Sequence, residues 1–212
     1  MYIPPKFALS EDDARAALAQ AGFAHLVTQA DGDMVVTPLP LLYEPDRHSL
    51  VGHVARANPH WKAVGASSVA IFSGPQAYVS PAWYPTKQET GKVVPTWNYD
   101  ALVVHGRLDV HDDPEWLRDL VERLTQRYER DRDRPWQVSD APEAYIAGQL
   151  KGIVGVELAI TSVEGKAKMS QNQPDRNRDG VIAGLRASPD AGDRAVADRV
   201  EALGNPDPDR SS

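Results

Sequence analysis

The sequence predicts a mainly β fold with a few flanking helices. Short segments of alternating or β-branched apolar residues recur along the chain, and turn residues separate them about every 8–12 residues. This spacing is typical of an all-β barrel or sandwich. The expected strands cover residues 23–28, 34–43, 48–54, 68–72, 76–80, 97–111 and 153–162.

The turns and prolines refine this pattern. Asp31-Gly32-Asp33 predicts a hairpin turn, because Asp and Gly accept the backbone conformations that tight hairpins need. Gly74-Pro75 predicts a second turn within residues 68–80. Pro38 and Pro40 lie on one side of an expected strand, and proline cannot donate a ladder hydrogen bond. That strand should therefore be an edge of the sheet or carry a bulge.

Three helices are expected between the strands. Ser10 can cap a helix to about residue 20, Asn58 one to about residue 65, and Asp113 one to about residue 130. From residue 187 the chain is rich in Ala, Asp, Arg and Pro and has few large apolar residues. We therefore expect one domain over residues 1–186 and a polar tail over residues 187–212 that is partly helical or disordered.

Composition excludes several classes of function. The chain of 212 residues contains no cysteine, which rules out disulfides, cysteine nucleophiles and zinc–thiolate sites. Its net charge of −7 argues against broad nonspecific binding of nucleic acids. No signal peptide and no apolar run of membrane-helix length is visible, so we expect a cytoplasmic protein without a membrane partner.

The segment from His53 to Trp61 is the most informative one for function. It reads as a strand that ends on Arg56 and turns directly into a helix with Asn58 as N-cap and Pro59 in the first turn. A helix N-terminus exposes unpaired amides, and the arginine adds a forked cation. The segment is a hypothesis for a phosphate site, although a capped helix beside a surface arginine is common.

Two segments are rich in aromatic residues. Residues 72–84 and Val94-Pro95-Thr96-Trp97-Asn98-Tyr99 could each supply a flat wall, and the asparagine could bond the edge of a heteroaromatic ring. Aromatic side chains belong more often to a core or a subunit contact, so both interpretations stay open.

A short cationic segment, Gly165 to Asn172, follows the last expected strand. Lysines at a strand end are usually solvated. Together with Arg176, however, this run of hydrogen-bond donors could hold an anion or a ribityl chain.

Metal and DNA sites are not favoured. Residues 175–180 match the first half of a calcium loop, but Arg186 stands where a bidentate glutamate is required, so we expect no metal. The helix from residue 114 carries an arginine stripe interleaved with acidic residues, a pattern typical of a solvated helix. We therefore expect no tight direct binding to duplex DNA. The stripe consists of Arg123, Arg127, Arg130 and Arg134.

Five ordered motifs within residues 1–186 resemble the PaiB family, whose members are called FMN-binding negative transcriptional regulators. Departures from the family pattern occur at Lys6, Gln76 and Gln173. The motifs are Tyr2-Ile3-Pro4-Pro5-x-Phe7, the His53–Trp61 run, Gly74-Pro75-x-Ala77-Tyr78-Val79-Ser80-Pro81-x-Trp83-Tyr84, Val94-Pro95-Thr96-Trp97-Asn98-Tyr99 and Lys166-x-Lys168-x-Ser170-Gln171-Asn172.

The resemblance implies a split β-barrel like that of pyridoxamine phosphate oxidases, and homodimers with FMN in clefts at the subunit interface. By this likeness one group of residues would hold the flavin and its phosphate, and a second group would close the site, from the same or the other subunit. The first group is Thr37, Pro38, Leu39, His53, Val54, Ala55, Arg56 and Asn58; the second is Trp97, Asn98, Lys168, Ser170, Gln171 and Asn172.

Three functional interpretations follow from the sequence. The first is an FMN-binding homodimer with a role in negative transcriptional regulation, and the second is an FMN-dependent oxidoreductase acting on a small molecule. The third is a dimer whose flavin site is empty. No acid–base pair that would identify a catalytic residue is visible.

Overall fold

The computed structural model describes residues 1–30 and 32–204. The chain divides into two compact units. The first unit comprises Met1–Ala14, Ser73–Leu102 and the chain from Glu164 onward, and the second comprises Arg15–Phe72 and Val103–Val163.

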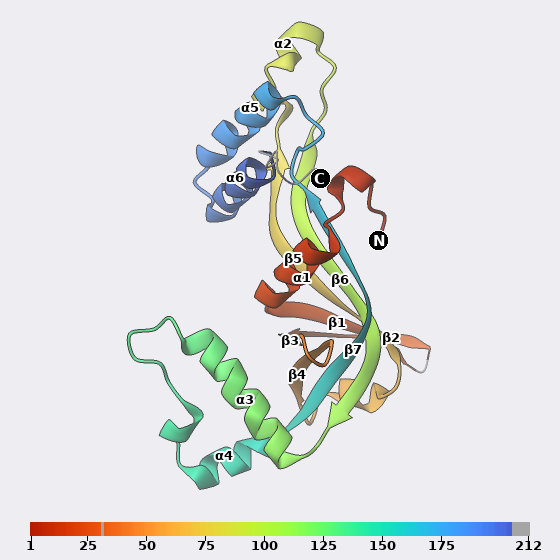
Figure 1. Ribbon diagram of the computed structural model, residues 1–212, viewed down its shortest axis with the longest axis vertical. Helices are drawn as coiled ribbons and strands as arrows, with labels where there is room; N and C mark the ends of the chain where they lie inside the picture. Colours follow the sequence, from red (N-terminus) through yellow and green to blue (C-terminus); the bar gives the residue numbers. More distant parts are fainter. Residues whose placement is uncertain (31, 205–212) are drawn as a thin grey trace. The chain divides into compact units, whose positions relative to one another are not determined.

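A single seven-stranded sheet runs in the order β2-β1-β5-β6-β7-β4-β3 (Figure 1). β1 pairs antiparallel with β2 and β5, and β4 pairs antiparallel with β3 and β7. The predicted mainly β fold with flanking helices is thereby confirmed. The strands are β1 Phe23–Ala30, β2 Asp33–Pro40, β3 Leu42–Glu44, β4 Ser49–Ala55, β5 Ser67–Val79, β6 Thr96–His111 and β7 Ile153–Lys168.

Helices of two kinds connect the strands. Within the described residues, none of them is long and apolar enough to span a bilayer. The α-helices are α1 Glu11–Gln20, α2 Thr86–Thr90, α3 Pro114–Glu129, α4 Glu143–Leu150, α5 Asp175–Arg186 and α6 Ala191–Gly204. The 3-10 helices are η1 Pro5–Phe7, η2 Pro59–Ala63, η3 Pro81–Trp83 and η4 Val138–Asp140.

β2 is the edge strand that its prolines predicted. It stands at one end of the strand order, and Pro38 lies opposite His25 of β1. The strand is shorter than expected, because the Leu41 amide donates to the Gly22 carbonyl at 2.7 Å and the chain then continues into β3. Asp31 of the predicted hairpin turn lies outside the described residues.

The second predicted hairpin is wrong. β5 runs unbroken from Ser67 to Val79 through Gly74-Pro75. A Cβ at Gly74 would lie 2.7 Å from the Cβ of Asp100, so this glycine permits close approach of β6 rather than a turn. β7 likewise continues to Lys168, so the cationic segment begins inside the strand rather than after it.

Helix starts were predicted better than helix lengths. The Ser10 hydroxyl accepts from the Asp13 amide at 3.1 Å, and the Asp113 carboxylate accepts from the Trp116 amide at 2.8 Å, so both caps are confirmed. Asn58 also caps as predicted, but the helix after it is only the five-residue η2. It stops because the chain turns at Gly65 (φ 79°), whose amide donates to the Leu108 carbonyl at 2.6 Å.

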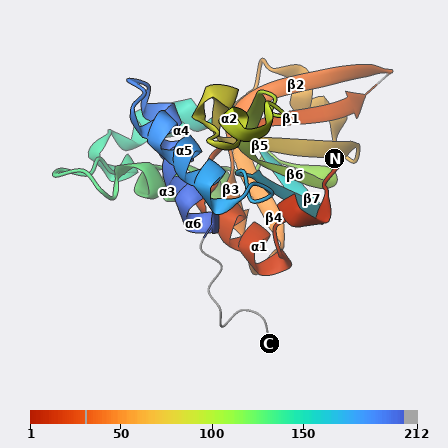
Figure 2. The same ribbon diagram turned by 90° about the horizontal axis from the view of Figure 1, so that it is seen from above.

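In the first unit, α5 and α6 lie side by side and share an apolar core with β5 (Figures 1 and 2). Val196 and Val200 of α6 are fully buried in that core beside Leu185 of α5. Residues 191–204 of the expected polar tail therefore form a packed helix, and residues 205–212 lie outside the described part of the chain.

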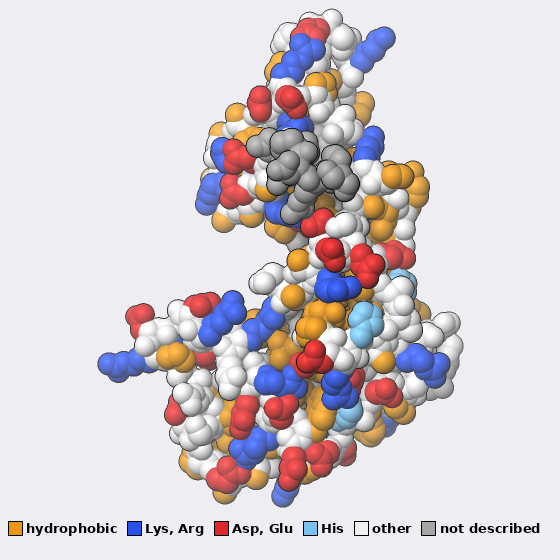
Figure 3. All heavy atoms as spheres, in the orientation of Figure 1, with side chains coloured by type: hydrophobic (Ala, Val, Ile, Leu, Met, Phe, Trp, Pro, Cys, Tyr) orange, Lys and Arg blue, Asp and Glu red, His pale blue; other side chains and the backbone are white. Residues whose placement is uncertain are grey.

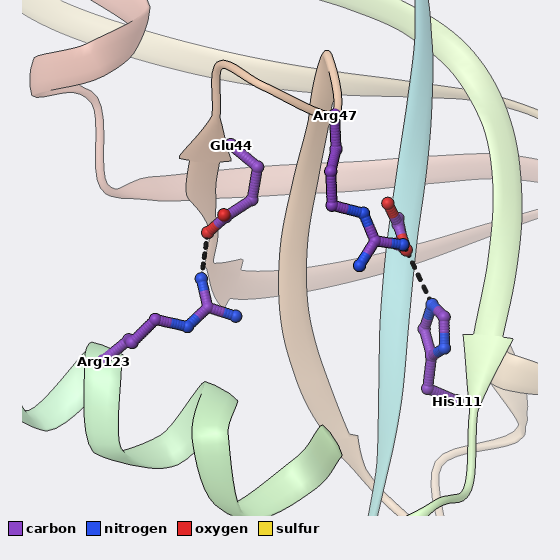
Figure 4. A network of polar contacts seen from close by, with 5 residues as sticks. Glu44, Arg47, His111 and Arg123 are labelled. Carbon is purple, nitrogen blue, oxygen red and sulfur yellow. Dashed lines mark hydrogen bonds and ion pairs between the residues drawn. The ribbon is translucent and has the colours of Figure 1, made fainter.

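In the second unit, α3 packs on β3 and β4 through Leu120 and Leu124. Nearby, the buried carboxylate of Glu157 on β7 accepts from Arg47 at 2.9 Å and contacts His111 Nε2 at 2.7 Å (Figure 4). A carboxylate buried without such partners would be costly. These contacts therefore tie the turn before β4 to the end of β6.

Gly155 on β7 faces the Trp116 ring so closely that any Cβ there would lie 2.2 Å from a ring carbon. We expect Gly155→Ala to lower the free energy of unfolding by about 1–3 kcal/mol through overpacking. Gly148→Ala is the matched control, because a Cβ at this α4 position meets nothing within 4 Å. It should stabilise the helix by up to about 1 kcal/mol. Urea unfolding of both variants measures the difference, and equal effects would contradict this packing.

Candidate functional site

A buried histidine organises the first group of predicted site residues, all of which belong to the second unit. His60 of η2 is fully buried, with Nδ1 2.8 Å from the Thr37 hydroxyl and Nε2 2.8 Å from the Thr28 hydroxyl. Thr28 in turn lies 2.6 Å from the Ser68 hydroxyl, and Asn58 donates to Thr37 at 3.1 Å. The network holds η2 against β1, β2 and β5, and it brings the predicted residues Thr37 and Asn58 together.

The predicted site residues of β2 place their side chains on opposite faces of the strand. Thr37 and Leu39 are buried, whereas Pro38 between them is exposed. Successive side chains of a strand alternate between its two faces. A ligand on the open face of β2 would therefore meet Pro38 and the backbone, and Thr37 would act by fixing Asn58.

β4 supplies a polar atom without a partner. Val54 is part of the core, Ala55 is exposed, and His53 is partly buried. The His53 Nδ1 atom is buried and has no hydrogen-bond partner among the described residues. Burial lowers the pKa of His53, which favours the neutral imidazole at neutral pH. Nδ1 therefore keeps a hydrogen-bonding position that no described residue fills.

Arg56 is already engaged. Its guanidinium donates to both carboxylate oxygens of Asp112, one of them at 2.9 Å. It also donates to the Lys151 carbonyl at 2.8 Å and the Ile153 carbonyl at 2.9 Å. The hydrogen bond from Arg56 lowers the pKa of Asp112. A phosphate at Arg56 would have to compete with this carboxylate.

Arg56 and Asp112 also line a cavity of about 550 Å³. Leu117 of α3 and Leu150 of α4 supply apolar surface, and Arg118 and Glu143 supply charged surface. The volume is in the range of small-molecule sites. Arg56, the residue predicted to bind the phosphate, therefore lines a cavity of small-molecule size.

The second group of predicted residues belongs to the first unit. Half of its side chains already have their hydrogen-bonding atoms occupied by partners within that unit. Asn98 and Ser170 are buried and bond each other at 3.0 and 3.2 Å. Gln171 donates to the Ala167 carbonyl and accepts from the Met169 amide, both at 2.7 Å. Asn98, Ser170 and Gln171 therefore shape this segment.

Trp97, Lys168 and Asn172 remain open to a ligand. Trp97 is 53% exposed, and its ring meets Tyr78 edge to face at 6.2 Å. The Lys168 ammonium donates to the Trp97 carbonyl at 2.8 Å and to the Thr96 hydroxyl. Asn172 is exposed. Trp97 and Tyr78 therefore expose aromatic surface in this unit, and the Trp97 backbone bonds the Lys168 ammonium.

A groove of about 410 Å³ was missed by sequence reasoning. It lies in the second unit, on the open face of the sheet, and no single motif marks it because its residues come from five strands. They include Val27, Gln29, Met34, Ser67, Val69, His105 and Thr161. The only sequence signal was the mixed polar and apolar character of alternate strand residues.

Comparison with known proteins identifies the family. Residues 1–162 match the family model described as "Putative FMN-binding domain". The chain belongs to this family. FMN is accordingly its cofactor, as the motifs implied.

Relatives and solved structures agree with this assignment. The chain is 29% identical to "Protease synthase and sporulation protein PAI 2" of Bacillus subtilis, over 95% of this chain and 97% of that protein. It is 37% identical to an uncharacterized protein of Emericella nidulans, over 73% of each. The FAD and heme binding protein of Mycobacterium smegmatis aligns with a TM-score of 0.55 at 18% identity, covering 82% of this chain and 78% of that one. The fold is the split barrel that the resemblance implied.

The donor set of this chain fits FMN. In the second unit, His53 Nδ1 has no partner among the described residues and Arg56 is a cation suited to a phosphate. In the first unit, Lys168 is a cation suited to an electron-rich ring edge and exposed Trp97 offers a stacking face. Bound FMN would supply hydride or electron transfer. Within residues 1–30 and 32–204 no cluster of three or more His, Asp or Glu side chains is arranged to hold a metal ion.

The burial of His60 makes a prediction about pH. Desolvation lowers the pKa of His60 below its ordinary value of 6.5, so below that pH the unfolded chain takes up the proton more readily than the folded one. The neutral His60 ring should therefore make its full contribution to the free energy of unfolding above pH 6.5. That contribution should fall as the pH drops toward the folded-state pKa of His60. His60→Asn should be less stable at neutral pH but should lose less stability on acidification.

His53 has a pKa lowered in the same direction and contributes to the same slope. His53→Asn therefore serves as the parallel variant, and chemical denaturation at several pH values separates the two. An unchanged slope in both variants would show that neither imidazole is held neutral by burial.

Proposed function

We propose that this protein is a cytoplasmic homodimer that binds FMN and serves in the negative regulation of transcription. The observation that carries the dimer is an open apolar face of the sheet in the second unit. The regulatory role is supported by the likeness over nearly full length to the Bacillus subtilis protein named for protease synthase and sporulation.

The open face is formed by β1 and β2. Phe23, Met34 and Val36 are 61%, 62% and 54% exposed, an unusual density of large apolar side chains for two neighbouring strands. The register pairs Val36 with Val27 and Met34 with Gln29, so these side chains share one face. The groove described above includes Met34 and therefore borders the same face.

A second copy of the chain is the occupant we propose for this face. Homodimers with flavin between the subunits are what the resemblance to the PaiB family implies, and an edge strand interrupted by prolines cannot extend the sheet by strand pairing. Burying an apolar face against its own symmetry mate satisfies both constraints. The groove beside Met34 would then be closed by the partner.

The proposed FMN site takes up the two predicted groups. The segment from His53 to Asn58, with Thr37, Pro38 and Leu39 beside it, would hold the flavin and its phosphate. Trp97 and Asn98, together with the segment from Lys168 to Asn172, would close the flavin site of the same or the partner subunit.

Regulation without direct binding to duplex DNA is favoured by the charge pattern. Arg123 is paired with Asp119 and Glu44, and Arg127 donates to the carbonyls at the end of α1. Figure 3 shows acidic and basic side chains interleaved over the region of α3 and α4. Such a surface lacks the run of unpaired cations that phosphate binding requires. The regulatory effect would then pass through flavin chemistry, a metabolite or a protein partner.

A flavin-dependent oxidoreductase is the second candidate, favoured by the cavity and groove of small-molecule size. Oxidation of NAD(P)H by the FMN-loaded protein distinguishes the two roles. An oxidoreductase should consume NAD(P)H over many catalytic cycles, whereas a regulator that only binds FMN should not.

Arg56 provides the test of the phosphate site. Arg56→Ala should weaken FMN by roughly tenfold or more while leaving riboflavin nearly unchanged, because riboflavin lacks the phosphate. Asp112→Asn removes the competing carboxylate and should tighten FMN by up to about fivefold. Flavin fluorescence titrations give both affinities, and equal weakening of FMN and riboflavin by Arg56→Ala would place the phosphate elsewhere.

Val36 provides the test of the dimer. Val36→Glu puts a charge into the proposed interface and should weaken dimerisation roughly a hundredfold or more. Tyr145→Glu is the control, because Tyr145 is 58% exposed on α4, outside the proposed interface. Sedimentation equilibrium at micromolar concentration measures the fraction of dimer for the natural protein and both variants. A monomeric natural protein, or a Val36→Glu variant as dimeric as the control, would contradict the proposal.

A further inference from the structure

Two lysines of β7 form no salt bridge with any carboxylate of residues 1–30 and 32–204. Lys166 is only 8% exposed, yet its ammonium has just one described hydrogen bond, to the Tyr2 carbonyl at 3.2 Å. Its remaining described contact is with the Tyr99 ring, 5.1 Å away. A buried ammonium is normally paired with a carboxylate.

Lys168 stands two residues further along the same strand. Its ammonium bonds the Trp97 carbonyl and the Thr96 hydroxyl, both neutral. Burial lowers the pKa of Lys168, Tyr99 raises it, and the neighbouring charge of Lys166 lowers it again. Residues two apart on a strand share a face about 7 Å apart, so the two ammonium groups repel each other.

No carboxylate in the described part of the chain forms a salt bridge with either lysine. The acid nearest in sequence, Glu164, forms a salt bridge with the N-terminal ammonium of Met1. Each lysine has three donor hydrogens, so at least one on each ammonium remains for a ligand. Among the described residues, both ammonium groups therefore keep donor hydrogens that an anionic ligand could accept.

The surroundings of the pair favour an anion with a flat ring. Trp97 is 53% exposed on β6, the strand next to β7, and its ring meets that of Tyr78 on β5, 47% exposed, edge to face. The Trp97 carbonyl accepts from Lys168, so the residue that bears the exposed indole is bonded to this ammonium through its backbone. A planar ligand can stack on the indole while its carboxylate reaches the cations.

We propose that Lys166 and Lys168, with Trp97 and Tyr78, select a small aromatic carboxylate as the ligand of the flavin site. The assignment rests on the proposed FMN function and names the class of small molecule that the site accepts. It also gives Lys166, which is not among the predicted flavin residues, a role in choosing that molecule.

Benzoate and its neutral analogue benzamide are the probes, titrated into FMN-loaded protein. Benzoate should perturb the flavin absorption spectrum and bind at least about tenfold more tightly than benzamide. Lys166→Met should weaken benzoate by a similar factor. Lys92→Met, which removes an exposed lysine of the same unit, should change nothing.

Each other outcome has a separate meaning. If FMN binds but benzoate and benzamide bind equally, or Lys166→Met has no effect, the aromatic carboxylate is wrong and the FMN function stands. If Lys166→Met weakens FMN as much as benzoate, the lysines serve the flavin itself and the inference is overturned. If the protein takes up no FMN, the proposed function fails, and calorimetric titration of benzoate still decides whether the lysines bind a carboxylate.

Discussion

The position of the candidate site in the second unit depends on one buried imidazole. His60 is fully enclosed, and both of its ring nitrogens contact threonine hydroxyls, on β1 and on β2. A hydroxyl can donate or accept, so the neutral ring is satisfied in either tautomer, whereas a charged ring would have no carboxylate beside it. This requirement holds the short helix η2 against β1 and β2. Asn58, bonded to Thr37, is positioned as a consequence.

Electrostatic pairing, rather than residue type, decides which cations are available. Arg56 has the better geometry for a phosphate, but Asp112 and two backbone carbonyls already occupy its guanidinium. Lys166, which is buried, and Lys168, which is partly exposed, are less specific as residue types, yet their ammonium groups bond only to neutral partners among the described residues. The lysines therefore keep more hydrogen-bonding capacity for an anion than Arg56 does, because at Arg56 a ligand must displace a carboxylate.

Close packing at two glycines of the sheet contrasts with the open surface of β1 and β2. Gly155 lets the Trp116 ring lie against β7, and Gly52 lets β4 approach the end of β2, where a Cβ would come within 2.7 Å of the Pro40 carbonyl. No comparable covering meets the exposed side chains of Phe23, Met34 and Val36. A monomer gains nothing from keeping such a face in water, which is why the proposed function places a second subunit there.

The sequence by itself determined the local features, because these depend on neighbouring residues. The caps at Ser10, Asn58 and Asp113 and the edge position of β2 follow from side-chain and proline chemistry within a few residues. The ordered motifs also identified the family and its cofactor. Only the tertiary structure decided the rest, because it depends on segments far apart in the chain. Asp100 made Gly74 a packing position instead of a turn, and Leu108 ended the helix after Asn58. Asp112, 56 residues beyond Arg56, neutralised the cation that the sequence favoured, and no local pattern could reveal that contact.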